Sequence, residues 1–93
     1  MQREQPWTEI VLGVLRSLGA DRRAVSVAEI YRAVREAVPL RCDDSSLYRY
    51  EAEGRGFSEP KWKKNVRDAL VKLERRGLAV RERRGLWRLA SQT

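Results

Sequence analysis

Positively charged side chains are concentrated in the last third of this 93-residue chain. Residues 59–93 hold eleven Lys and Arg against four Asp and Glu, whereas residues 1–58 hold nine of each kind. The whole net charge of +7 therefore belongs to the C-terminal segment. Such a segment favours a polyanionic partner, because every phosphate that it neutralises releases condensed counterions. A solvated Arg-rich surface without a partner is the plainer alternative.

A helix is predicted over about residues 59–76, with an apolar stripe on one face and basic side chains on the other. On a helix in a DNA major groove, Arg67 could bond guanine, Asn65 adenine and Asp68 cytosine, while lysines hold phosphates. Asp68 could also orient a neighbouring Arg, Asn65 could make a local structural bond, and the lysines could be plain solvated charge. The candidate DNA-binding residues of this helix are Lys61, Lys63, Lys64, Asn65, Arg67, Asp68 and Arg75.

A hairpin is predicted over residues 78–90, where two short apolar runs flank an Arg-rich connection around Gly85. Its cationic tip could lie on the DNA backbone or enter a minor groove. Trp87 shares a strand face with Leu89, which favours the core over a stacking role. The candidate DNA-binding residues of the hairpin are Arg81, Arg83, Arg84 and Arg88.

Two more helices are predicted to position these residues. Apolar residues at three- and four-residue spacings indicate helices at about 7–18 and 27–38, and Ser26 with Glu29 matches a capping box at the start of the second. The variable segment 39–57 is expected to hold one short turn of helix at 47–51. The order predicts one domain over residues 1–93, mainly α with a small β-hairpin, of the winged helix-turn-helix class with three helices plus a wing.

Aromatic residues are more frequent around the start of the 59–76 helix than a plain linker needs. Trp7, Tyr48, Tyr50 and Trp62 could form a pocket there for the methyl group of a modified base. The alternative interpretation places Trp7 and Trp62 in the core.

The segment Trp62–Leu70, the Gly77-Leu78 pair and the run Gly85-Leu86-Trp87-Arg88-Leu89 resemble the N-terminal winged-helix domain of Mrr-type, modification-dependent restriction endonucleases. The resemblance covers about residues 58–90. It implies a target-recognition module of a restriction-type system, associated with a prokaryotic nucleoid, with double-stranded DNA as partner and a fused or associated nuclease domain. A stand-alone transcriptional regulator and a protein-binding winged helix are the alternatives.

Catalysis is not expected from this composition. With no histidine and one cysteine, the usual zinc sites and the Ser-His-Asp and Cys-His systems are excluded. Asp43 or Asp44 with Glu59-Pro60-Lys61 loosely resembles a metal-dependent nuclease motif, but a proline at a helix start does not suit carboxylates that must share a metal on adjacent strands. We therefore expect no enzyme activity, no cofactor and no metal.

No apolar run is long enough to cross a membrane, and the N-terminus lacks the pattern of a signal peptide. A soluble, cytoplasmic protein without a membrane partner is expected. The sequence leaves the oligomeric state open.

Overall fold

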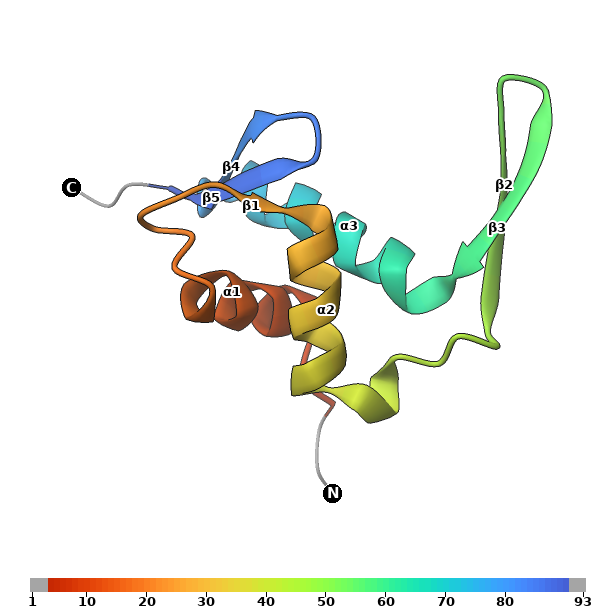
Figure 1. The fold of residues 1–93 in the computed structure, drawn as a ribbon, viewed down its shortest axis with the longest axis horizontal. Coiled ribbons are helices and arrows are strands. Elements are labelled where there is room, and N and C mark those ends of the chain that lie inside the picture. The colour runs from red at the N-terminus through yellow and green to blue at the C-terminus, as the bar shows by residue number, and fades with distance from the viewer. Residues whose placement is uncertain (1–3, 91–93) are drawn as a thin grey trace.

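The computed structural model describes residues 4–90, which fold as a small α+β domain of three helices and two antiparallel sheets (Figure 1). The helices are α1 (Trp7–Ser17), α2 (Val27–Ala37) and α3 (Lys61–Arg75), with a 3-10 turn η1 (Pro39–Arg41) after α2. The strands are β1 (Val25–Ser26), β2 (Leu47–Ala52), β3 (Arg55–Pro60), β4 (Ala79–Arg83) and β5 (Leu86–Leu89). Each predicted helix and the C-terminal hairpin are found within two residues of their expected bounds, and this arrangement is compatible with the predicted winged helix.

The core lies where the three helices meet the sheet of β1, β4 and β5. The apolar stripes of the helices supply most of its fully buried side chains, namely Val11, Leu15, Ile30, Val34, Val66, Leu70 and Leu73, and β1 adds Val25. Trp62 of α3 and Trp87 of β5 are each 3% exposed, so both indoles belong to this core. The interpretation of Trp87 as a core residue is thus confirmed.

Strand β5 is the centre of the three-stranded sheet, which has the order β1-β5-β4. Val25 pairs with Trp87, and the N–H of Val27 donates to the carbonyl of Gly85 over 3.0 Å. The predicted capping box is present, with the Glu29 N–H donating to Ser26 Oγ at 3.1 Å and the Ser26 N–H to Glu29 Oε2 at 2.8 Å. The start of α2 is therefore fixed directly beside the turn of the β4–β5 hairpin.

The segment before α3 is a second hairpin, so the predicted turn of helix at 47–51 is wrong. Strands β2 and β3 pair along their whole length and project from the body of the domain (Figure 1, green). They are joined by the two-residue turn Glu53-Gly54, whose φ angles of 54° and 75° are both positive. This is the combination that a type I′ turn requires, and such turns match the twist of an antiparallel hairpin.

The start of α3 differs from the predicted helix start at about residue 59, as Ser58, Glu59 and Pro60 show. All three residues belong to β3, Pro60 is extended with ψ of 134°, and the helix begins at Lys61 without a side-chain cap. The residue before a proline avoids the helical region, which keeps Glu59 in the strand. The N–H of Lys61 is satisfied instead by the carbonyl of Ser46 at 2.8 Å.

Candidate nucleic-acid interface

The solvent side of α3 carries most of the charged residues predicted for this helix. Lys61, Asp68 and Arg75 are exposed, and Lys64 is half-buried with its Nζ 2.7 Å from Asp68 Oδ2. The hydrogen bond to Asp68 raises the pKa of Lys64. These side chains lie opposite the buried stripe, as the helical period predicts.

Arg67 is held in place by neighbours on two other elements. Its guanidinium donates to both carboxylate oxygens of Glu59, with Nη1 2.7 Å from Oε2, and to the hydroxyl of Tyr31 at 3.1 Å. The pair with Glu59 raises the pKa of Arg67 above its ordinary value. To bond a guanine, Arg67 would have to give up some of these partners.

The β4–β5 hairpin and α3 share one surface. Arg81, Arg83 and Arg84 are exposed. A groove of about 430 Å³ lies between the two elements, lined by Arg67, Asp68 and Val71 of the helix and by Arg81, Arg84 and Trp87 of the hairpin, with Val27, Leu70 and Gly85. The structure therefore brings the predicted residues of the helix and of the hairpin together.

Within the hairpin, two arginines are engaged by neighbours. The Arg81 guanidinium lies 4.9 Å from the centroid of the Trp87 ring, and Arg88 Nη1 lies 3.2 Å from Glu82 Oε1. The ion pair is exposed on both sides and is therefore weak. A phosphate could replace Glu82 as the partner of Arg88.

Two predicted residues point to the flanks of α3. The Nζ of Lys63 lies 5.3 Å from the centroid of the Tyr31 ring, on the side of α2. Asn65 lines a depression that it shares with Trp7, Thr8, Lys72 and Arg76, on the side of α1. Neither residue lies at the centre of the solvent side of the helix.

The four residues of the predicted modified-base pocket are not brought together. Trp62 is buried and packs edge-on against Tyr31, with 5.7 Å between ring centroids. Trp7 is at the start of α1, 4.4 Å from the guanidinium of Arg41. Tyr48 and Tyr50 lie on β2, and within residues 4–90 they are the only two of the four rings that stack on each other.

Asp44 has a role that the sequence interpretation missed. Its Oδ1 accepts from the indole N–H of Trp62 at 3.0 Å and from Arg35 Nη2 at 2.7 Å. The indole and then the guanidinium hold the pKa of Asp44 below its usual range. This carboxylate ties the loop after η1 to α2 and α3.

Of the described residues, no three Asp, Glu or Cys lie where they could hold a metal ion together.

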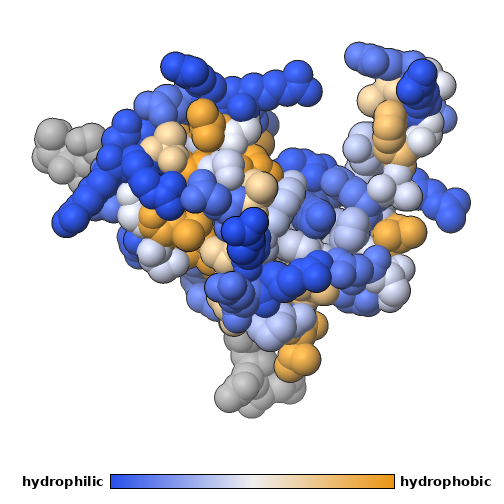
Figure 2. All heavy atoms as spheres, viewed as in Figure 1, coloured by the Kyte–Doolittle hydropathy of each residue, from blue (hydrophilic) through white to orange (hydrophobic). Residues whose placement is uncertain are grey.

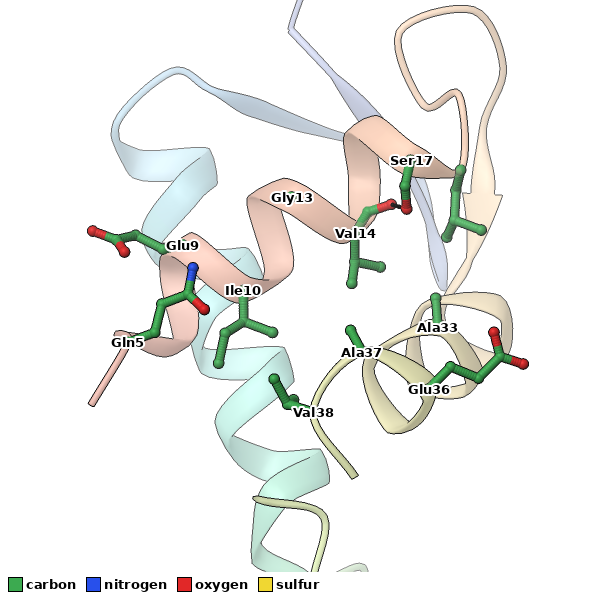
Figure 3. Close-up of a pocket in the computed structure, with 11 residues that line it drawn as sticks. Gln5, Glu9, Ile10, Gly13, Val14, Ser17, Ala33, Glu36, Ala37 and Val38 are labelled. Atoms are coloured by element: carbon green, nitrogen blue, oxygen red, sulfur yellow. Dashed lines mark hydrogen bonds between the residues drawn. The ribbon is translucent and has the colours of Figure 1, made fainter. Parts of the chain in front are cut away.

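A second groove, of about 680 Å³, lies between α1 and α2 (Figure 3). Ile10, Val14 and Ala37 point into it, while Glu9 and Glu36 stand at its two ends. Carboxylates at the rim repel phosphates. This groove is therefore no candidate for a polyanion.

Comparison of the chain with protein-family models, with curated proteins and with solved structures finds no match in any of the three. None of the helices within residues 4–90 is long and apolar enough to span a membrane.

Proposed function

We propose that this domain binds double-stranded DNA as a winged helix, with α3 as the recognition helix in the major groove and the β4–β5 hairpin as a wing on the backbone or in the minor groove. The order of elements supports this proposal. Helices α1, α2 and α3 precede the hairpin, and β1 joins it to complete a small sheet of order β1-β5-β4.

The observation that carries the proposal is the groove shared by α3 and the wing. Cationic groups from both elements line it, and they belong to the segment that holds the whole net charge of the chain. A major groove about 12 Å wide accepts one helix, and a neighbouring hairpin then reaches the adjacent backbone. Asp68 is the one acid among the residues that line this groove, and it pairs with Lys64.

The resemblance of residues 58–90 to Mrr-type winged-helix domains supports a role as the target-recognition part of a restriction-type system, with a nuclease as its partner. A stand-alone regulator would use the same surface. A protein-binding domain is the second candidate, and the apolar floor of the α1–α2 groove favours it.

The salt dependence of binding to a labelled duplex tests the proposal. Among the described residues, the cations of this surface without an acidic partner are Lys61, Arg75, Arg81, Arg83 and Arg84. If all of them reach phosphates, the log–log slope is about −4.5, and affinity falls about 500-fold between about 50 and 200 mM salt. Affinity that stays flat over this range would remove the electrostatic basis of the proposal and favour the protein-binding candidate.

A matched pair of variants locates the surface. Arg83→Ala with Arg84→Ala should weaken binding to all sequences alike and make the salt slope shallower by about 1.8. The control, Arg16→Ala with Arg22→Ala, removes the same charge from exposed positions on α1 and the loop after it. Equal losses for the two pairs would show that only net charge matters and would contradict the placement of the wing on DNA.

A further inference from the structure

The β2–β3 hairpin presents a row of three aromatic rings that the core does not use. Tyr48 stacks on Tyr50 with 6.0 Å between centroids, and Tyr50 stacks on Phe57 with 5.5 Å. Tyr50 and Phe57 are 37% and 43% exposed. An isolated two-stranded sheet is marginally stable in water, and exposed apolar groups in a continuous row mark binding surfaces.

The row lies on the side of the hairpin that faces the basic surface of α3. Residues directly opposite in an antiparallel pair share a face, which places Tyr48 beside Glu59 and Tyr50 beside Phe57. Lys64 of α3 lies 4.8 Å from the centroid of the Tyr48 ring, and Glu59 is the partner of Arg67. The row therefore begins at the proposed DNA surface and continues outward along the hairpin.

Each face of the hairpin carries one Arg and one Glu, and Glu53 lies in the turn at the tip. The aromatic face carries Arg55, which pairs with Ala52 near the tip, and Glu59, whose charge Arg67 neutralises. Glu51 and Arg49 lie on the reverse face, because side chains alternate along a strand. The rings are thus flanked by cations, Lys64 at the base and Arg55 near the tip, which suits a ligand with both anionic and planar groups.

We infer that this row binds unpaired bases of a nucleic-acid strand that leaves the duplex held by α3 and the wing. Bases inside a duplex are stacked on one another and offer only their edges, whereas unpaired bases offer flat faces to aromatic rings. In the space-filling view the hairpin stands clear of the body of the domain, with an open notch between it and the wing (Figure 2). The inference rests on the proposed function for the duplex part of the ligand.

The test compares a blunt duplex with the same duplex carrying a single-stranded tail of about six nucleotides, within the range that single-strand binding sites cover. Both tail polarities are measured by fluorescence anisotropy. The native domain should bind one tailed duplex at least about fivefold more tightly than the blunt one, since one base stacked on an aromatic ring contributes at least that factor. Tyr50→Ala with Phe57→Ala should abolish this gain and leave the affinity for the unmethylated blunt duplex, which is the duplex used throughout this test, unchanged.

Two further variants separate loss of stacking from loss of the hairpin. Tyr50→Leu with Phe57→Leu keeps an apolar cross-strand pair but removes the flat rings, and it too should abolish the gain. Leu47→Ala removes an exposed apolar side chain on the reverse face and should retain the gain.

Equal affinity of the native domain for tailed and blunt duplexes would overturn the inference and leave the row as a face for a protein partner. Weaker blunt-duplex binding by both aromatic variants would also overturn it, because the rings would then grip the duplex itself. Failure of the native domain to bind the blunt duplex at low salt would refute the proposed function instead.

Discussion

The ion pair between Arg67 and Glu59 joins α3 to the β2–β3 hairpin, and its free energy can be bounded from its surroundings. The Glu59 side chain is 16% exposed and that of Arg67 is 41% exposed. Exposed pairs couple by about 0.2–1 kcal/mol, whereas breaking a fully buried pair costs about 3–5 kcal/mol. For this partly buried pair with two charge-assisted hydrogen bonds, we predict a coupling energy of about 1–2 kcal/mol.

A double-mutant cycle measures this coupling. Arg67→Met keeps the aliphatic stem of the side chain, Glu59→Gln keeps the size and polarity of its partner, and the double variant completes the cycle. Unfolding in urea, monitored by tryptophan fluorescence, reports the free energy of unfolding. With a denaturant slope of about 1 kcal/mol/M, the predicted coupling corresponds to a difference of about 1–2 M urea in the unfolding midpoint. A coupling below about 0.5 kcal/mol would refute the reasoning that this pair fixes the hairpin on α3.

The same Arg67→Met variant separates two roles of this residue in binding. If Arg67 reads a base, its replacement should cost roughly 1–3 kcal/mol more binding free energy on a preferred site than on random DNA. If Arg67 only positions the hairpin, its replacement should cost the same binding free energy on both duplexes. Competition between the two duplexes decides between the roles.

Three further predictions concern α2, the loop after it and the rings. Ser26→Ala should lower the free energy of unfolding by about 1 kcal/mol in urea, because it removes one half of the capping box; an unchanged midpoint would contradict this. The lowered pKa of Asp44 means that its contribution to stability is present above the ordinary Asp pKa of about 4 and is lost as the pH falls below it. In the Asp44→Asn variant, the free energy of unfolding should therefore fall less steeply than in the native domain as the pH is lowered below about 4. An equally steep fall in both proteins would argue against the contacts of Asp44 with Trp62 and Arg35. The sequence-based prediction of a methylated-base preference now depends on Tyr48 and Tyr50; a gain of roughly 10- to 200-fold on methylated duplexes is expected, and binding of methylated and unmethylated duplexes within about twofold would refute it.

Much of the fold was predictable because its signals are local. The apolar period of α1 and α2, the Ser26–Glu29 capping box and the Gly85 turn each act within a few residues of sequence. The alternation of Tyr48, Tyr50 and Ala52 before Gly54 was also a local signal for a hairpin, and it was missed because Glu-Gly is a less familiar type I′ pair than Asn-Gly.

The site was less predictable because its decisive contacts join distant segments. Arg67 reads in sequence as a free side chain on the basic side of a helix, and only the extended conformation of Glu59 before Pro60 brings a carboxylate to it. Asp44 and Trp62 are eighteen residues apart, and their hydrogen bond depends on how the loop crosses the start of α3. Spacing along the chain carries no information on either contact.

The position of β5 has a consequence for the order in which this domain acquires its structure. The central strand of the three-stranded sheet is the last one along the chain, and its partner β1 lies about sixty residues earlier. Closing such a long loop costs entropy that only later contacts offset, which makes the pairing late in folding. During synthesis, a chain that has emerged only as far as Gly85 has α1, α2 and α3 but lacks the buried Trp87 and the strand that joins β4 to β1. The proposed recognition helix would thus be made before the sheet that steadies it, and DNA affinity should arise only when the final strand is added.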